Sequence, residues 1–375
     1  MTKYTDFVNY NLSMLTDQVR TEAYRRAIAR TVRGNHVVVD LGTGSGVLAF
    51  FACQAGARRV YAIESEEVIE MARQICRNNG FQDRVVFLHD HSFRVELPEK
   101  ADVIVTETLG TFGIDEGLVG SVIDARTRFL KTGGTIIPRA LELFVAPVEV
   151  PGFYTHMIDF WAGGRYDIDF SPARRFAVNN FHPIKLDEGT FLSTPLRLAR
   201  ITLPDATTSD VHSKLAFYAK RRGRLFGFAG WFNAELVEDI CLSNAPSGVT
   251  SHWGMAFFPL ERPVDVERGD PIKVAINATR NGTVWQWEFR RDDQEFKQST
   301  IWGFPQAPGE PHKLSPGAAP KLSAKGRAEL FILSLLNGEK TVGELQLELL
   351  ERYPDLILDI EQAASFVQEV VMKFT

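Results

Sequence analysis

The stretch VVVDLGTGSG, residues 37–46, decides the fold of the first half of the chain. Its β-branched start predicts a short buried strand, and its glycines predict a tight turn into the helix-forming apolar segment 47–52. Glycines at positions 42, 44 and 46 let the backbone pass close beneath a ligand. The third glycine of a dinucleotide fingerprint would fall at Val47, so the spacing disfavours NAD.

An acidic residue further along the chain completes this pattern. The apolar run 60–63 ends at Glu64, about twenty residues after the turn, where a carboxylate can accept hydrogen bonds from ribose hydroxyls. A nucleoside without a pyrophosphate fits this arrangement best. A glycine-rich turn after a strand also occurs in plain βα loops. Asp40, the three glycines and Glu64 together favour S-adenosylmethionine as the cofactor.

Two glutamates, Glu107 and Glu116, follow the apolar run 101–105, which predicts another buried strand. Open α/β sheets bind ligands at the carboxyl ends of their strands, so Glu107 is expected in that crevice. Two convergent carboxylates match a planar guanidinium, which stays charged at any physiological pH. We interpret the pair as a cation clamp. On its own such a pair more often consists of solvated charges or helix caps, and the upstream glycine turn changes this balance.

Four motifs in this order resemble the protein arginine N-methyltransferases. They are MLTDQVRT at residues 14–21, the glycine turn, the two glutamates, and Ser251-His252-Trp253, in which serine replaces the usual threonine. The resemblance covers residues 11–305. It implies that the two glutamates hold an arginine side chain and that Asp17 and Arg20 lie near the cofactor. It also implies that His252 pairs with Asp17.

The resemblance assigns further roles. Arg20, as a planar donor fork, suits the methionyl carboxylate of the cofactor. A proton can leave through Glu116, or through His252 oriented by Asp17. Without the resemblance, Arg20 would be interpreted as a surface charge on a helix over residues 17–29, and His252 as a structural histidine.

Met14 resembles the small apolar gate of enzymes that place two methyls on one nitrogen, although a lone methionine is more often core filler. Met14 and Trp253 are the predicted substrate contacts. The family's aromatic-rich N-terminal helix is represented only by residues 1–10, and Asn11 stands where the family often has histidine, so we expect a shorter lid. Phe93 falls near a family glutamate that reads adenine. The predicted cofactor site is Arg20, Asp40, Gly42, Gly44, Gly46, Glu64 and Ser92, with Asp90 or His91 as alternatives to Ser92.

Composition sets limits on the class of protein. With 375 residues, 45% apolar and 24% charged, the chain predicts a soluble protein of two or three domains. Its three cysteines are far apart and indicate neither a disulfide framework nor a zinc site, which fits a cytoplasmic location. A net charge of −5 disfavours a general nucleic-acid binder, and no segment predicts export or membrane insertion.

The sequence predicts an α/β fold in which a Rossmann-like domain precedes a β-barrel-like domain and a small all-α module. Strands near 37, 60, 85, 103 and 135 alternate with helices, and short β-rich runs follow Pro138. The predicted parts are a helical segment 1–30, the Rossmann-like domain 31–140, the β-barrel domain 141–306 with a dimerisation arm at about 155–185, a Pro-rich linker 307–320 and a helical module 321–375. The arm predicts a head-to-tail homodimer.

The module 321–375 contains Thr341 and Glu344, which predict a capping box. It is similar to peptide-recognition modules beside enzymes that modify ribosomal peptides, and a helical cap on the barrel or the partner subunit is an equal alternative. The predicted function is methylation of an arginine guanidine in a peptide or protein, with S-adenosylmethionine as donor. Two alternatives stay open: methylation of free arginine or another small guanidine, and an inactive scaffold.

Overall fold

The computed structural model describes residues 3–246, 252–291, 294–304, 319 and 321–374. The chain divides into two compact units, Met1–Pro305 and Gln306–Thr375, and each has its own hydrophobic core. The predicted Pro-rich linker falls almost wholly outside the described residues. Within those ranges, no helix combines the length and apolar character that crossing a membrane requires.

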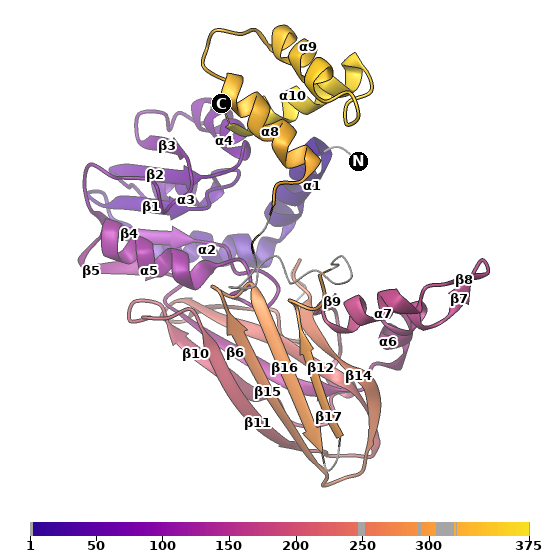
Figure 1. Cartoon of the computed structure of the whole chain (residues 1–375). Coiled ribbons are helices and arrows are strands. Elements are labelled where there is room, and N and C mark those ends of the chain that lie inside the picture. The colour runs from indigo at the N-terminus through magenta and orange to yellow at the C-terminus, as the bar shows by residue number, and fades with distance from the viewer. Residues whose placement is uncertain (1–2, 247–251, 292–293, 305–318, 320, 375) are drawn as a thin grey trace. The chain divides into compact units, whose positions relative to one another are not determined.

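A five-stranded parallel sheet forms the first half of the large unit (Figure 1). Its order is β3-β2-β1-β4-β5, so the strands predicted near 37, 60, 85, 103 and 135 form one sheet. The strands are β1 Val37–Leu41, β2 Arg59–Glu64, β3 Val85–His89, β4 Ala101–Thr106 and β5 Leu130–Ile137. The helices of this half are α1 Lys3–Thr16, α2 Gln18–Thr31, α3 Val47–Gln54, α4 Val68–Asn78 and α5 Leu118–Phe129.

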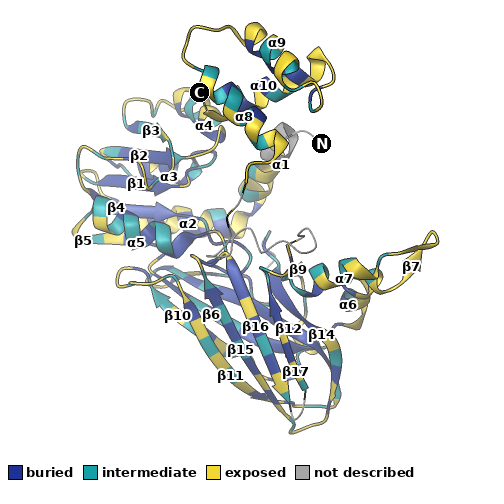
Figure 2. Cartoon of the chain, viewed as in Figure 1, coloured by how far each residue is buried: buried dark blue, intermediate teal, exposed yellow. Residues whose placement is uncertain are grey.

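Both faces of this sheet are buried because helices cover each side (Figure 2). Successive strand residues point to opposite faces. Val38 therefore packs in the core that contains residues of α2 and α3, and its neighbour Val39 packs in the core that contains Phe129 of α5. Strands buried on both faces have continuous apolar sequences, which is why the run at 37–41 was recognisable.

Two antiparallel sheets form the second half of the large unit. One has the order β10-β6-β12-β14-β9 with β13 beside β12, and the other has the order β11-β15-β16-β17. The strands are β6 Ala140–Val148, β9 His182–Ile184, β10 Leu196–Thr202, β11 Val211–Tyr218, β12 Gly223–Val237, β13 Ile240–Ser243, β14 Met255–Val266, β15 Pro271–Thr279, β16 Val284–Arg291 and β17 Gln294–Ser299. The short helix η2 Glu188–Thr190 lies between β9 and β10.

The expected β-barrel is not closed. Among the described strands, no ladder joins the two sheets, which instead face each other across an aromatic core. The Phe258 ring from one sheet lies 5.6 Å from Trp285 and 5.3 Å from Trp287 of the other, measured between ring centroids. Side chains of this size fill the space between two packed sheets, so the core forms without hydrogen-bonded closure.

An arm projects from the sheet domain (Figure 1). It consists of α6 Pro151–Met157, η1 Asp159–Ala162, the hairpin β7 Gly164–Arg165 and β8 Ile168–Asp169, and α7 Ser171–Val178. Buried Tyr154 anchors its base by donating its hydroxyl to the carbonyls of Leu260 at 2.8 Å and Glu261 at 3.0 Å. At the tip, Tyr166 is 91% exposed and Ile168 is 56% exposed.

The small unit contains α8 Ala324–Leu335, α9 Val342–Arg352 and α10 Ile360–Phe374. The predicted capping box is present: Thr341 Oγ1 accepts the Glu344 N–H, and the Glu344 carboxylate accepts the Thr341 N–H at 2.7 Å. Ile332, Leu349 and Val367, one from each helix, are fully buried together. The unit therefore has a core of its own.

We expect Leu349→Ala to lower the stability of the small unit by about 2–5 kcal/mol, because it leaves a cavity in that core. Differential scanning calorimetry of the full chain should show two transitions, of which only one shifts. Leu347→Ala is the matched control, since Leu347 lies on the same helix and is 61% exposed. A single transition that shifts as a whole would contradict the division into two units.

Candidate active site

A pocket of about 470 Å³ lies at the carboxyl ends of β1, β2 and β4, where ligands of parallel sheets bind. It brings together most of the predicted site residues: Met14, Arg20, Gly42, Gly44, Glu64, Ser92, Glu107 and Glu116. The other predicted residues, Asp17, Asp40, Gly46, His252 and Trp253, are not part of the pocket lining. Ser251 lies outside the described residues.

The glycine turn has a left-handed backbone at Gly42, Gly44 and Gly46, with φ values of 69°, 52° and 87°. A side chain at Gly46 is excluded because its Cβ would lie 2.5 Å from the Phe50 ring and because the backbone there is left-handed. The Gly42 N–H donates to the Ile63 carbonyl at 2.9 Å and fixes the turn against β2. The turn therefore presents its backbone to the pocket in a fixed position.

Asp40 stabilises this turn from beneath. Its Oδ2 accepts the Thr43 hydroxyl at 2.5 Å and the Ala49 N–H at 3.0 Å, which joins the turn to the first part of α3. The carboxyl group is fully buried, its Oδ1 has no hydrogen-bond partner among the described residues, and burial raises the pKa of Asp40 to about 7. Asp40 does not line the pocket, so its effect on a bound cofactor passes through the position of the glycine turn.

Glu64, at the end of β2, lines the pocket and is fixed by backbone donors. Its Oε2 accepts the Gly44 N–H at 2.9 Å, and its Oε1 accepts the N–H groups of Ser65 at 2.8 Å and Glu66 at 3.0 Å. A carboxylate has about four acceptor positions, so Oε2 retains capacity for a hydroxyl from the pocket. The ribose contact of Glu64 stays a prediction.

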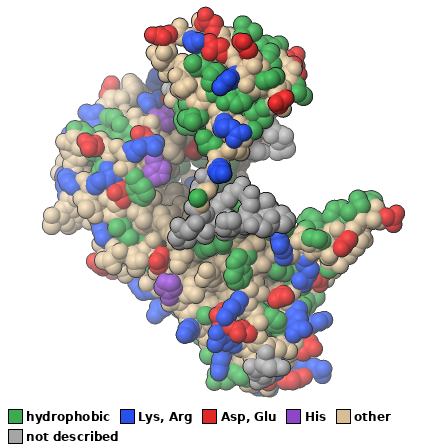
Figure 3. All heavy atoms as spheres, viewed as in Figure 1, with side chains coloured by type: hydrophobic (Ala, Val, Ile, Leu, Met, Phe, Trp, Pro, Cys, Tyr) green, Lys and Arg blue, Asp and Glu red, His purple; other side chains and the backbone are tan. Residues whose placement is uncertain are grey.

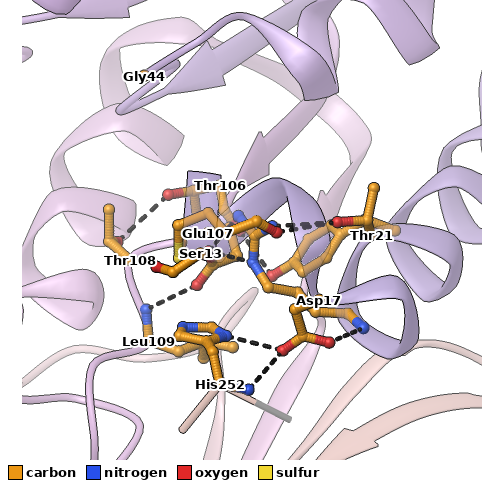
Figure 4. A network of polar contacts seen from close by, with 12 residues as sticks. Ser13, Asp17, Thr21, Gly44, Thr106, Glu107, Thr108, Leu109 and His252 are labelled. Carbon is orange, nitrogen blue, oxygen red and sulfur yellow. Dashed lines mark hydrogen bonds and ion pairs between the residues drawn. The ribbon is translucent and has the colours of Figure 1, made fainter. Parts of the chain in front are cut away.

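Glu107, at the end of β4, is bound by a guanidinium (Figure 4). Arg20 of α2 places Nε and one terminal nitrogen each 2.6 Å from Glu107 Oε2. Both side chains are almost completely buried, at 5% and 3% exposure. Burial raises the pKa of Glu107 although the Arg20 charge opposes this. The remaining oxygen, Oε1, accepts only a long 3.4 Å bond from the Leu109 N–H among the described residues.

Glu116 reaches the same pocket from the far end of this loop. Glu116 is accessible to solvent from the pocket. Its carboxyl group is nevertheless surrounded by protein atoms and lies near other carboxylates. Burial, followed by the charges of Glu107 and Asp115, raises the pKa of Glu116 to about 7, against a smaller opposing effect of Arg20. Asp115 itself closes the loop by accepting the N–H groups of Thr111 at 3.0 Å and Phe112 at 2.7 Å. The predicted pair therefore shares one pocket.

Asp17 and His252 are in contact, as the sequence implied (Figure 4). Asp17 Oδ2 lies 2.7 Å from His252 Nδ1 and also accepts the His252 N–H at 2.9 Å, while Oδ1 caps α2 by accepting the Arg20 N–H at 3.0 Å. Burial alone would raise the pKa of Asp17, but these hydrogen bonds lower it. Trp253 is 9% exposed and packs on Phe232, so its predicted substrate contact stays a prediction.

Helix α1 contributes Tyr10, Asn11, Met14 and Leu15 to the pocket lining. The expectation of a shorter lid stays a prediction, because the structure fixes no closed state. Partial burial and the nearby carboxylates of Glu116 and Glu107 raise the pKa of Tyr10 to about 12. Sequence reasoning missed Tyr10 as a pocket residue. Its i, i+4 spacing from Met14 on one helix was the available signal.

Other residues were also missed or left open. Asn244, at 6% exposure, donates its amide to the Thr111 carbonyl at 2.9 Å and the Gly254 carbonyl at 2.8 Å, and so joins the loop after β4 to the segment that follows His252. No sequence pattern marked it. At the predicted adenine end, Asp90, His91 and Ser92 all line the pocket, whereas Phe93 does not and is 49% exposed.

The pocket residues fit S-adenosylmethionine. The backbone of Gly44 borders the pocket, and a Cβ built there would meet one atom within 4 Å, Asn11 Oδ1 at 3.6 Å, which also belongs to a pocket residue. Glu64 has acceptor capacity for ribose hydroxyls, and Arg20, which also donates to the Met14 carbonyl and the Thr21 hydroxyl, lines the pocket in which the cofactor carboxylate is predicted. Within the described residues, no group of three or more His, Cys, Asp or Glu side chains has the arrangement of a metal site.

We expect Arg20→Met and Glu107→Gln each to lower the free energy of unfolding by about 3–5 kcal/mol, because each leaves a buried partner uncompensated. The double variant should lose less than the sum, with a coupling energy of about 0.5–3 kcal/mol. Urea denaturation of the wild type, the two single variants and the double variant measures the four free energies of unfolding. The exposed pair Arg25 and Glu22 provides a control cycle that should stay close to the wild type. Strictly additive losses at Arg20 and Glu107 would contradict the assigned coupling.

Comparison with known proteins places this site in a family. A model described as the arginine methyltransferase oligomerization subdomain matches residues 139–297, and one described as ribosomal protein L11 methyltransferase matches residues 21–138. The chain is 34% identical to protein arginine N-methyltransferase 6 of Xenopus tropicalis, with 72% of this chain and 83% of the relative covered. It is 30% identical to probable protein arginine N-methyltransferase 6 of Arabidopsis thaliana, with 73% of each covered.

Solved structures show the same fold. Arabidopsis thaliana protein arginine methyltransferase 10, in an open conformation, superposes with a TM-score of 0.68 at 25% identity, covering 78% of this chain and 99% of the other. The Trypanosoma brucei PRMT1 enzyme-prozyme heterotetrameric complex with AdoHcy superposes with a TM-score of 0.70 at 21% identity, covering 77% and 96%. Together with the 34% identity to a relative of which 83% is covered, this likeness shows that the chain belongs to the protein arginine N-methyltransferase family.

Proposed function

We propose that this chain transfers a methyl group from S-adenosylmethionine to a guanidino nitrogen of arginine in a peptide or protein. One observation carries this proposal. Glu107 already binds one guanidinium, that of Arg20, at 2.6 Å, and both residues line the same pocket as Glu116. Arg20 engages only Oε2 of Glu107, so Oε1, with a 3.4 Å bond from the Leu109 N–H, and Glu116 retain acceptor capacity for a second guanidinium. Family membership supports the same activity.

The chemistry needs a positioned guanidine, because its lone pairs are delocalised and it is a weak nucleophile. S-adenosylmethionine supplies an electrophilic methyl on a sulfonium sulfur. Glu107 and Glu116 bind nitrogens of the substrate and so localise the lone pair on the remaining one and aim it. Attack makes the N–H protons of the product acidic. Glu116, with a pKa raised to about 7, is suited to accept the departing proton, and His252 held by Asp17 is the second candidate.

Two alternatives share this site. Free arginine or another small guanidine would need the same carboxylates, and an inactive scaffold would keep the fold without transfer. Incubation with labelled S-adenosylmethionine and either free arginine or an arginine-containing peptide separates them. Transfer to the peptide supports the proposal. Transfer to free arginine alone supports the small-molecule enzyme, and transfer to neither despite cofactor binding supports the scaffold.

We expect Glu107→Gln to abolish transfer, because a neutral amide cannot hold the substrate cation, while cofactor affinity is largely retained. Radiolabel transfer and isothermal titration with S-adenosylmethionine measure the two effects. Glu22→Gln, on the exposed surface of α2, is the control and should keep wild-type turnover. Substantial turnover by Glu107→Gln would reject the role assigned to Glu107.

We also propose a head-to-tail homodimer formed through the arm. Exposed apolar side chains at Phe160, Tyr166 and Ile168 lie along it, and hydrophobic side chains run along the arm on the face drawn in Figure 3. The matched oligomerization subdomain supports this assembly. Light scattering at micromolar concentration should give twice the chain mass, and Tyr166→Asp with Ile168→Asp should reduce it. A monomeric wild type would remove the proposal.

We propose a cytoplasmic location, which is supported by thiols such as Cys53 and Cys76 that are buried and unbridged. The small unit stays a candidate peptide-recognition module. Its similarity to such modules and its independent core support this proposal. Binding of the substrate peptide by the chain with and without Leu358→Asp, on its exposed surface, would test it.

A further inference from the structure

Glu116 is the one member of the glutamate pair that no side-chain cation grips among the described residues, so its position must come from the backbone that carries it. The residue after it, Gly117, is the N-cap of α5 and has φ 81°. Glycine offers no side chain to accept the first free N–H groups of the helix. A helix that begins at a catalytic carboxylate therefore needs its cap from elsewhere.

The cap comes from the sheet domain. Asn281 lies in the turn between β15 and β16, and its Oδ1 accepts the Gly120 N–H of α5 at 2.8 Å. Its Nδ2 donates to the Gly117 carbonyl at 2.9 Å. One amide thus bonds both to the N-cap residue and to the third residue of the helix, which is the N–H that a capping side chain normally satisfies.

The fit between turn and loop leaves no room for side chains on either side. A Cβ at Gly120 would lie 2.6 Å from Asn281 Nδ2, and a Cβ at Gly282 would lie 2.0 Å from the Ile114 carbonyl oxygen. Asn281 itself has φ 58°, a left-handed conformation that asparagine tolerates better than most residues. The turn therefore packs directly on the backbone at both sides of Glu116.

We propose that Asn281 is a positioning residue that holds Glu116 in the guanidinium site by capping α5 from the second domain. This inference rests on the proposed function. Asn281 is not among the pocket-lining residues, and its effect on substrate passes through Gly117 and Glu116. In this way the sheet domain contributes to a site whose carboxylates both come from the loop after β4.

The test uses Asn281→Gly, which removes the amide and accommodates the left-handed backbone, so no strain is added. Turnover should fall on the order of 10- to 100-fold, since a misplacement of about 1 Å costs that much, while the dissociation constant for S-adenosylmethionine stays within about twofold. Asp239→Gly is the matched control, because Asp239 also has φ 64° in a turn of the same domain. It should keep wild-type turnover.

A pH profile separates positioning from plain stability. The groups that act on Glu116 are Glu107 and Asp115 of its own loop, Arg20 of α2 and Tyr10 of α1. Wild-type kcat/KM should rise with pH through about 7, as Glu116 loses its proton and can bind the cation. In Asn281→Gly this limb should move to lower pH, because the pKa of Glu116 falls when its side chain moves away from Glu107 and Asp115 and becomes better hydrated. In Asn281→Asp it should move higher, because another anion approaches.

Hydrogen exchange gives a readout that does not need activity. The Gly120 amide should be protected in the wild type and in Asp239→Gly, and should exchange faster in Asn281→Gly. Unchanged turnover, pH profile and exchange in Asn281→Gly would overturn the proposal, as would a lower melting temperature with no shift of the pH limb. A wild type that methylates no guanidine would instead refute the proposed function, and Gly120 exchange would still decide whether Asn281 holds the loop.

Discussion

The site depends on keeping a carboxylate charged where water hardly reaches. Glu107 is 8% exposed, and burial raises its pKa, which disfavours the charged form that attracts a cation. Arg20 opposes that tendency with two contacts of 2.6 Å. Because Arg20 is held at the start of α2, whose N-cap is Asp17, this helix is as much a part of the site as the sheet. The guanidinium of the protein keeps the site ready for a guanidinium of the substrate.

The second constraint is that two domains must meet to complete one loop. The segment from Glu107 to Glu116 comes from the parallel sheet, but several of its polar contacts come from the sheet domain. Asn244 binds Thr111, and Asn281 caps the helix that follows Glu116. His252 binds Asp17 across the same boundary. A change in how the domains pack would therefore alter the separation of the two carboxylates without touching either of them.

Much of the fold could be predicted because each element has a local signal. Strands buried on both faces gave continuous apolar runs, and the glycine turn marked the ligand edge of the sheet. Glu64 and Glu107 were predictable since each directly follows a strand and so lies at the carboxyl edge. The capping box of Thr341 and Glu344 is a short-range pattern and was equally accessible. The prediction of a β-barrel was wrong because alternation along a strand is the same in a closed barrel and in two packed sheets.

Sequence by itself determined the chemistry at each position: the glycines of the turn, the carboxylates at strand ends, and the histidine and aspartate of separate motifs. Tertiary structure alone decided the partners. Arg20 was predicted as a cofactor contact; it lines the pocket, but its ion pair with Glu107 had no local signal, and Asn281 carried no signal at all. The physical reason is that a hydrogen bond between residues 87 or 161 positions apart in the chain, as in these two cases, depends on packing that local patterns do not encode.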